Sequence, residues 1–583
     1  MTQLQRRIAA AIFILSASLS LWHFISAGQS PFFDSPAIDE AFHHQWATAW
    51  SQGEAGPQLP FFRAPLYPAF LTFVYSLFNG SIFAGRLAGL LLGILNLFLV
   101  GLLLQRNVKH PSWLVVFGLY AFNGTVIYFQ PELLIVTFFI SLLLGGFLLL
   151  QQSQESSSVI SAGGAGLLFG LATIARPSLL IFLPLLFIWL WRYRKSWPQT
   201  SSLILLLLLP ILTVTAVNRF AGGETVLVAT QGGVNFYIGN HAEADGWSSS
   251  LPPAGVNWTM TDARLQALRD TGKQLTDAQL SDYFYRESWQ EITAAPKRWL
   301  KLMLYKTALL CSRTEIGNNR DIQFSMRQRP PLAWLHNWTL IPLLILGLLG
   351  MVRLLRSRDP RHRLWLGFIL SYGFGIVLFF VNARFRLPLL PFLTIFAGLE
   401  LAVNFEHKHH RQRVSHLEML ALLGISLLVI YPHRATQQDN NAQSHLSLGN
   451  AWLRQGRLMK AETQYRIGLQ EDSLRANLHL NLGVIAWQRD DHNTAQQEYE
   501  LELKYHPTSL QTLANLGALY HMEGDYRAAE QVLGKALRLN PLHTDAAYNY
   551  RLTCERLAAG FELREMADSA AFYRERFRKA VTP

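Results

Sequence analysis

The chain has 583 residues and a net charge of +12, and 50% of its residues are hydrophobic while only 15% are charged. An average soluble domain carries roughly 25% charged residues, so this composition excludes a wholly soluble protein. Most of the basic excess stands in short segments beside apolar blocks, without a basic surface interleaved with aromatic residues, which argues against nucleic-acid binding.

Long apolar blocks fill the chain before residue 432, and each can cross a hydrocarbon core of roughly 30 Å as a helix. The first block follows Arg6 and Arg7 and exceeds a signal-peptide core, so we expect an uncleaved first crossing. Two stretches, 65–78 and 298–312, are short or flanked by polar residues, and we expect them to lie in the interface or to re-enter the membrane. The predicted crossings are 8–27, 81–104, 111–129, 132–150, 159–175, 177–191, 201–217, 332–354, 363–381, 386–404 and 416–431.

Lys and Arg cluster in alternate loops of this order. The clusters are Arg106/Lys109, Arg192/Arg194/Lys195, Arg353 to Arg363, and Lys408/Arg411/Arg413. Because such residues concentrate in cytoplasmic loops, the loops at about 28–80 and 218–331 are predicted to lie outside. The last crossing of this multi-pass domain (1–432) then runs outward. The tail is therefore predicted on the periplasmic side of a bacterial cytoplasmic membrane.

The tail carries an internal repeat. Gly449, Gly483 and Gly517 recur every 34 residues, and Ala461, Ala495 and Ala529 keep the same steps. A helix-turn-helix unit of this length is the tetratricopeptide pattern, which needs small residues where its helices cross. We predict three repeats over 442–543 and capping helices over 544–583. Such repeats bind protein partners in a groove or only shape an assembly, and the sequence leaves both open.

The first outer loop contains two adjacent acids, Asp39 and Glu40. Ser35 suits an N-cap and Pro36 a first helical position, so a helix is predicted to begin there. Its apolar stripe is expected on a membrane surface, with Asp39 at the stripe's edge and Glu40 on the polar side. An acid facing an apolar surface needs a partner or a task, although two acids in a first turn also favour the helix dipole. The stripe comprises Ile38, Phe42, Trp46, Ala49 and Trp50.

Several arginines stand where the predicted topology reaches the outer face, where orientation does not require positive charge. Guanidinium groups suit phosphate because their planar fork donates paired hydrogen bonds and keeps its charge. A further acid, Glu132, follows Pro131 near the same face. A single arginine could simply reach lipid headgroups, but the group together with the acids predicts a lipid-phosphate site. The arginines are Arg63, Arg86, Arg176, Arg384 and Arg386.

The order of these motifs resembles glycosyltransferase family 39, which includes protein O-mannosyltransferases and lipid A aminoarabinose transferases. The motifs are Asp39-Glu40, Arg63-x-Pro65-Leu66-Tyr67-Pro68, Arg176-Pro177 and Arg384-x-Arg386-x-Pro388. Two further segments, Phe236–Asn240 with Asp245-Gly246 and Glu315–Asn319, resemble outer-loop segments of bacterial relatives. The resemblance covers residues 8–432 and implies a GT-C fold that transfers a sugar from a polyprenyl-phosphate donor on the outer side of the membrane.

The resemblance also implies roles for the residues. Asp39 would be the general base that accepts the acceptor hydroxyl's proton, and Glu40 would support it or contact substrate. The five arginines would hold the donor phosphate and stabilise the leaving group. With one carboxylate and no enzyme nucleophile, the sugar would invert. The remaining substrate contacts would be Tyr67, Glu132, Asn240 and Glu315.

No secure metal site is evident. Asp34, Asp39, Glu40 and Glu132 could gather an oxygen-ligated divalent cation. The family 39 members that the chain resembles are generally regarded as working without a metal, so we expect no cofactor. The sugar and the acceptor (protein, lipid or glycan) stay open.

Two other classes of function remain. An O-antigen ligase or polymerase would place its key residues in a large late outer loop, so comparing Asp39 with Arg313 and Arg320 would separate it. A non-catalytic scaffold whose repeats recruit partners would need neither Asp39 nor the outer arginines. A transporter is disfavoured, because no repeated halves with broken helices are evident.

Overall fold

The computed structural model describes residues 2–54, 56, 59–252, 255, 258–317, 320–409, 416–431 and 441–579. These residues are predominantly helical and contain no β-strand, apart from an isolated bridge between Leu251 and Gly255. The prediction of an all-α fold is confirmed. The chain divides into two compact units, Met1–Asp439 and Asn440–Pro583. Asn318, Asn319, Arg411 and Arg413, which the sequence singled out, lie outside the described residues.

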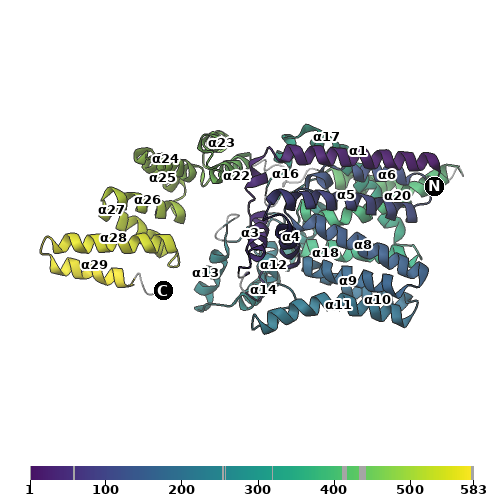
Figure 1. The fold of residues 1–583 in the computed structure, drawn as a ribbon, viewed down its shortest axis with the longest axis horizontal. Coiled ribbons are helices and arrows are strands. Elements are labelled where there is room, and N and C mark those ends of the chain that lie inside the picture. The colour runs from purple at the N-terminus through teal and green to yellow at the C-terminus, as the bar shows by residue number, and fades with distance from the viewer. Residues whose placement is uncertain are drawn as a thin grey trace. The chain divides into compact units, whose positions relative to one another are not determined.

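The first unit contains six described segments long and apolar enough to cross a membrane, as expected for a multi-pass membrane protein. Figure 1 shows several of these helices running alongside one another, among them α1, α5, α8 and α11. The six segments are α1 (Gln3–Ala27), α5 (Ile82–Asn107), α8 (Ile135–Ser156), α11 (Trp197–Phe220), α17 (Pro330–Leu354) and Ala383–Val403. The last contains α19 (Ala383–Arg386), the 3-10 turn η2 (Leu387–Leu389) and part of α20 (Leu390–His409).

Shorter helices complete the bundle and refine the predicted boundaries. The predicted crossing 111–129 is broken in two, because the Asn123 side chain accepts from the backbone N–H groups of Thr125 and Val126 and starts a new helix. The crossing predicted from 132 begins only at Ile135, so Glu132 lies in a turn. The two stretches left unassigned are both helical. The helices are α4 (Leu66–Leu77), α6 (Trp113–Ala121), α7 (Gly124–Tyr128), α9 (Val159–Ala175), η1 (Pro177–Ile181), α10 (Leu183–Tyr193), α15 (Pro296–Cys311), α18 (Pro360–Leu378) and α21 (His416–Ile430).

Hydrogen bonds gather the predicted cytoplasmic turns at one end of the bundle. The Trp189 indole donates to the Pro360 carbonyl over 2.7 Å, which joins α10 to the start of α18. The Gln199 amide donates to the Ser153 carbonyl over 2.9 Å, which joins α11 to the end of α8. Arg363 donates to the Tyr193 hydroxyl over 2.8 Å. The turns at this end contain the clusters Arg192/Arg194/Lys195 and Arg353 to Arg363.

The predicted outer turns gather at the opposite end, which we call the site end. Arg86, in the first turns of α5, donates to the carbonyl of Pro131 between α7 and α8 over 2.9 Å. Arg176, at the end of α9, donates to the carbonyl of Arg384 at 3.4 Å. The N–H of Arg313 donates to the carbonyl of Val429 over 2.9 Å, so α21 also ends here.

The first outer loop folds differently from the prediction. Its helix α3 (Asp39–Ser51) begins at Asp39, whereas Ser35 ends a separate turn, α2 (Pro31–Asp34). The reason is Ile38, whose φ of 53° is not helical and interrupts the helical backbone between α2 and α3. The expected membrane-surface stripe is also wrong in part, because Trp46 is only 5% exposed and packs in the protein core.

The long loop before α17 forms a small helical layer. Here α12 packs on α14 around a cluster that includes Ile238 and Phe284, with Phe380 from the end of α18 in the same cluster. This layer therefore contacts the segment that leads to Arg384. Its helices are α12 (Gly232–Asn240), α13 (Met260–Thr271) and α14 (Asp277–Ala294), whereas the short helix α16 (Ile322–Arg327) of the same loop contacts α17.

The second unit is a series of helix pairs with the predicted period. Gly449 and Gly483 lie against the rings of Tyr465 and Tyr499, and a Cβ on either glycine would approach the ring to 2.2 or 2.5 Å. Small residues are needed there because the two helices of each pair cross closely. The helices are α22 (Asn441–Arg454), α23 (Leu458–Glu471), α24 (Leu478–Gln488), α25 (His492–Tyr505), α26 (Leu510–Glu523), α27 (Tyr526–Leu539), α28 (Thr544–Glu562) and α29 (Ala567–Lys579).

Candidate active site

Asp39 lies between two arginines that come from distant parts of the chain. Its carboxylate is ion-paired with Arg63, which precedes α4, and with Arg384 of α19 at 2.5 Å. Arg384 is presented by a short helix that the Asn382 side chain caps by accepting from the Phe385 N–H over 3.0 Å. Burial would raise the pKa of Asp39, but the guanidiniums of Arg384 and Arg63 outweigh it and hold that pKa well below its usual range. Asp39 is therefore ionised and fully paired.

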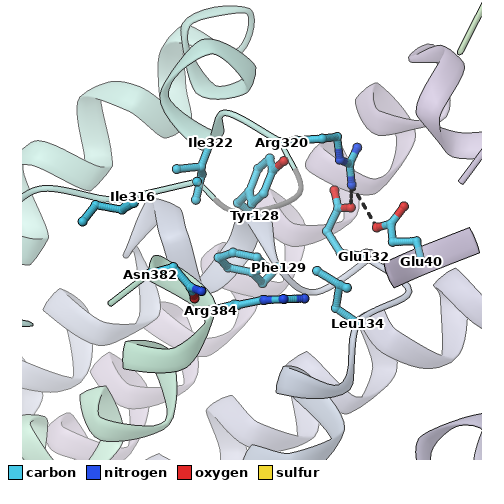
Figure 2. Close-up of a pocket in the computed structure, with 11 residues that line it drawn as sticks. Glu40, Tyr128, Phe129, Glu132, Leu134, Ile316, Arg320, Ile322, Asn382 and Arg384 are labelled. Atoms are coloured by element: carbon cyan, nitrogen blue, oxygen red, sulfur yellow. Dashed lines mark hydrogen bonds and ion pairs between the residues drawn. The ribbon is translucent and has the colours of Figure 1, made fainter. Parts of the chain in front are cut away.

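Glu40 occupies a different and more buried environment. It is only 1% exposed, so its expected orientation toward the polar side is wrong. Its carboxylate accepts from Arg320 over 2.9 Å and from Arg86 over 3.3 Å. Arg320 is also ion-paired with Glu132, and Figure 2 shows Arg320 joined to both acids. Two carboxylates and two guanidiniums thus compensate one another in the protein interior.

A third buried pair joins Arg386 and Glu315. The two side chains approach to 2.8 Å, and the other carboxylate oxygen of Glu315 accepts from the Thr125 hydroxyl over 2.9 Å. Arg386 also donates to the carbonyls of Ser312 and Thr314. Arg86 is saturated in a similar way, since it donates to the carbonyls of Phe32, Phe33 and Pro131. Arg86 and Arg386 therefore use their hydrogen-bond donors within the protein.

Arg176 and Arg384 are less completely partnered. No described carboxylate forms an ion pair with Arg176, which donates to the Tyr372 hydroxyl over 2.8 Å. The Nε atom of Arg384 is buried without a hydrogen-bond partner among the described residues. Both guanidiniums lie on the ring of Phe385, at 4.6 and 5.1 Å from its centroid. The two neighbouring guanidiniums would stabilise an anion bound between them.

A pocket opens beside these groups. Arg384 lines it and also contacts Asp39, whereas Asp39 itself is not among the described lining residues. The Nδ2 atom of Asn382 is buried with no partner in the described part of the chain, so the pocket has an unused donor. The lining residues are Glu40, Tyr128, Phe129, Glu132, Leu134, Ile316, Gly317, Arg320, Ile322, Asn382 and Arg384. Figure 2 shows them around the pocket.

Three of the four predicted substrate residues are absent from the described pocket lining: Glu315, which pairs with Arg386, and Asn240 and Tyr67. Asn240 is fully buried and its amide donates to the carbonyls of Phe236 and Leu378, both over 2.8 Å, so it serves the packing of α12 against α18. Tyr67 is 3% exposed and packs edge-on against the ring of His43, 5.1 Å away. Neither lines the pocket.

Four residues of this region carry no role in the motif-based prediction. Arg320 follows the Glu315 segment, and nothing in the sequence distinguishes it from other loop arginines. In the structure it is ion-paired with both Glu40 and Glu132. Asn382 stands two residues before Arg384, and the preference of Asn for N-cap positions was the available signal. Tyr128 precedes the Glu132 turn. Burial lowers the pKa of the fourth residue, His43, to about 3 although the Asp39 carboxylate acts in the opposite direction, so its ring is neutral at neutral pH.

In the described part of the chain, no group of three or more His, Cys, Asp or Glu residues is arranged to hold a metal ion. Of the four acids that could gather a cation, three pair with arginines: Asp39 pairs with Arg63 and Arg384, and Glu40 and Glu132 share Arg320.

Comparisons with known proteins give structural similarities of low TM-score and one match to a family model. Among solved structures, the archaeal oligosaccharyltransferase AglB from Archaeoglobus fulgidus, in complex with an inhibitory peptide and a dolichol-phosphate, is 12% identical with a TM-score of 0.33. The match covers 78% of this chain and 58% of that one. MamA is 15% identical over 30% of this chain and 87% of that one, with a TM-score of 0.21.

The first tetratricopeptide domain of Spaghetti (RPAP3) bound to an HSP90 peptide is 19% identical over 20% of this chain and 94% of that one, with a TM-score of 0.20. No curated protein sequence matches the chain. A family model described as "Tetratricopeptide repeat" matches residues 510–535, so the tail of this chain contains tetratricopeptide repeats.

Proposed function

We propose that the chain is an integral-membrane glycosyltransferase that moves a sugar from a polyprenyl-phosphate donor to an acceptor on the outer face of the membrane. The observation that carries the proposal is the Asp39 carboxylate, paired with Arg63 and Arg384 beside a pocket at one end of a bundle of membrane-spanning helices. An ionised acid, free guanidinium capacity and a pocket at a membrane surface are what transfer from a lipid phosphate requires.

The donor phosphate would bind Arg176 and Arg384. These two guanidiniums share the Phe385 ring, and neither is saturated by the protein. Six arginines of the region face four carboxylates, so the site keeps an excess of positive charge. That excess suits a leaving phosphate, whose negative charge grows as its bond to the sugar breaks. Arg86 and Arg386, which the family resemblance assigned to phosphate, would instead hold the framework.

The acceptor would be activated by Asp39. While two guanidiniums neutralise it, Asp39 is a weak base, and Arg384 lies between it and the pocket. A donor phosphate that draws Arg384 away would raise the basicity of Asp39 and expose it. The acceptor hydroxyl then gives its proton to Asp39 while its oxygen attacks the anomeric carbon. The bond from that carbon to the phosphate oxygen breaks, and polyprenyl phosphate leaves with the electron pair, which inverts the sugar.

The sugar would occupy the pocket itself. Tyr128 and Phe129 offer aromatic surface, and Asn382, Glu132 and Glu40 offer polar atoms for its hydroxyls. Pockets of this kind, with an apolar wall and a few fixed polar groups, are typical of small-molecule sites. Glu40 and Glu132 would also fix Arg320 at the pocket's edge.

The repeats would lie on the same side of the membrane as the site. The support is that α21, the last helix before them, ends beside Arg313 at the site end. The basic clusters at the opposite end favour that end as the cytoplasmic one, which makes the repeat side periplasmic. There the repeats would recruit a protein acceptor or an assembly partner.

The test is Asp39→Asn in purified protein supplied with labelled polyprenyl-phosphate sugars and a membrane extract as acceptor source. We expect release of polyprenyl phosphate to fall by roughly 100-fold or more, because a positioned base contributes about that much. The matched control is Asp34→Asn, an exposed acid on the neighbouring α2, which should transfer normally. Near-normal turnover by Asp39→Asn would remove Asp39 as the base. No release by the wild-type protein with any donor would remove the transferase proposal.

A further inference from the structure

The segment Phe236–Asn240 stands apart from the pocket, although the sequence singled it out. It forms the end of α12 and packs directly on the end of α18, where a Cβ on Gly239 would lie 2.0 Å from the Phe379 carbonyl oxygen. Only a glycine allows this approach. The close contact brings α12 to the two residues that end α18, a few positions before Asn382 and Arg384.

The carbonyls at the end of α18 accept hydrogen bonds from side chains of other helices. A helix end leaves its final carbonyls without partners inside the helix, so they must find other donors when they are buried. The Asn240 amide donates to the Leu378 carbonyl over 2.8 Å, and the Lys306 ammonium donates to the Phe379 carbonyl over 2.6 Å. Lys306 also donates to the Gly239 carbonyl over 2.7 Å, so one ammonium joins α12 to α18.

Lys306 is an unusual residue for this task. It is 0% exposed, and no described carboxylate forms an ion pair with it. Burial lowers its pKa to about 7, with Asp245 acting in the opposite direction. Burying an ammonium is costly unless its donors are used, and the two carbonyl contacts offset part of that cost. The Trp299 indole supports the same arrangement by donating to the Asn240 side-chain oxygen over 2.8 Å.

The carbonyls of Leu378 and Phe379 come shortly before the segment that carries Arg384 and Arg386. Beyond Phe379, the Val381 N–H donates to the Gly246 carbonyl and the Ala383 N–H to the Ile316 carbonyl, both over 2.9 Å. Asn382 then caps the turn that carries Arg384 and Arg386. The segment therefore leaves α18 along a path fixed at each step. Lys306 and Asn240 fix its first step.

We propose that Lys306, with Asn240 and Gly239, forms a clamp on the end of α18 that positions Arg384 and Arg386 in the site. Lys306 is a positioning residue, since it touches neither the pocket nor Asp39. The clamp accounts for the Phe236–Asn240 motif, which the site itself does not use. The part of this inference that concerns catalysis rests on the proposed transferase function, whereas the part that concerns the segment's order does not.

Hydrogen exchange in the full-length protein tests the clamp directly. In Lys306→Met, we expect the backbone amides of residues 381–386 to exchange about tenfold faster or more, because the local opening becomes easier. The matched control is Lys301→Met, an exposed lysine on the same helix α15, which should leave these amides unchanged. Trp299→Phe, which removes only the indole N–H, should give a smaller increase and serves if Lys306→Met does not fold. Wild-type exchange of residues 381–386 in these variants would overturn the clamp.

Binding of polyprenyl phosphate, followed by tryptophan fluorescence, tests what the clamp does for the site. We expect Lys306→Met to bind it more weakly, while Lys301→Met binds as the wild type does. Faster exchange with unchanged binding would show that the clamp does not position the arginines, and would overturn that assignment. If the wild-type protein binds no lipid phosphate and transfers no sugar, the proposed function fails, and the exchange data still decide the clamp.

Discussion

Asp39 and Glu40 are adjacent in the chain, yet they meet different sets of arginines. Asp39 pairs with Arg63 and Arg384, whereas Glu40 pairs with Arg86 and Arg320, and one arginine of each pair, Arg384 or Arg320, lines the pocket. Consecutive residues in a first helical turn point about 100° apart, so one turn of α3 serves two clusters. Arg320 is held by two carboxylates, Glu40 and Glu132, whereas Arg384 pairs with Asp39 alone and keeps its Nε atom without a partner among the described residues, which is why we propose different tasks for the two acids.

His43 lies one helical turn beyond Asp39 and gives the site a measurable pH dependence. Its pKa is about 3 in the folded protein and about 6.5 in the unfolded chain. The unfolded chain therefore takes up the proton first as the pH falls, and the free energy of unfolding decreases between pH 6.5 and 3. By pH 5 the loss from this one residue is about 2 kcal/mol.

The variant His43→Phe keeps a ring against Tyr67 but cannot titrate. The thermal unfolding temperature, measured in detergent, should therefore fall less between pH 7.5 and 5 in the variant than in the wild type. Above pH 7 the two proteins should differ by a constant amount. Parallel curves down to pH 5 would show that His43 is not held neutral by burial.

At the scale of elements, the sequence predicts the long helices because their apolar length is itself the signal. The block predicted over 8–27 is α1 (Gln3–Ala27), and the block over 332–354 is α17 (Pro330–Leu354). Boundaries set by single side chains were harder. The break at Asn123 and the strained φ of Ile38 depend on local geometry that hydrophobicity does not encode.

The sequence predicted several residues that lie together at the site end, but it did not predict which of them form pairs. The topology placed Arg63, Arg176 and Arg384 at one membrane face, and the structure gathers them at one end of the bundle. It could not say that Arg86 would be used up by backbone carbonyls or that Arg320 would join Glu40 to Glu132. Those contacts arise from tertiary packing between segments far apart in the sequence.

The repeat helices give a prediction at the same scale. In Gly483→Ala the new Cβ would lie 2.5 Å from the buried ring of Tyr499, and overpacking of this kind costs about 1–3 kcal/mol. A Cβ on Gly560 of α28 would meet open space, so Gly560→Ala should instead stabilise by roughly 0.5–1 kcal/mol. Denaturant unfolding of residues 440–583, which contain their own cores, measures both. Equal stability of the two variants would contradict the close helix crossing.

For the whole molecule, the sidedness of the two units links the fold to the proposed function. A transferase that uses an outer-leaflet donor and a repeat unit that recruits its acceptor must expose both to the same compartment. The site end contains the ends of α9 and α21, whereas the basic clusters stand at the other end. This arrangement predicts that loops of the site end and the repeats are labelled from outside the cell, and that the basic turns are not.

Single cysteines can test this in intact cells, because the chain has only Cys311 and Cys554 to replace. Lys273→Cys reports on the long outer loop, Lys195→Cys on a basic turn and Glu523→Cys on the repeats, and all three positions are exposed. We expect a membrane-impermeant maleimide to reach positions 273 and 523 once the outer envelope is opened, and position 195 only after the inner membrane is permeabilised. If position 523 behaved like position 195, the repeats would be cytoplasmic and could not present an acceptor to Asp39. If position 273 did so, the arginine site would face the wrong leaflet for the donor.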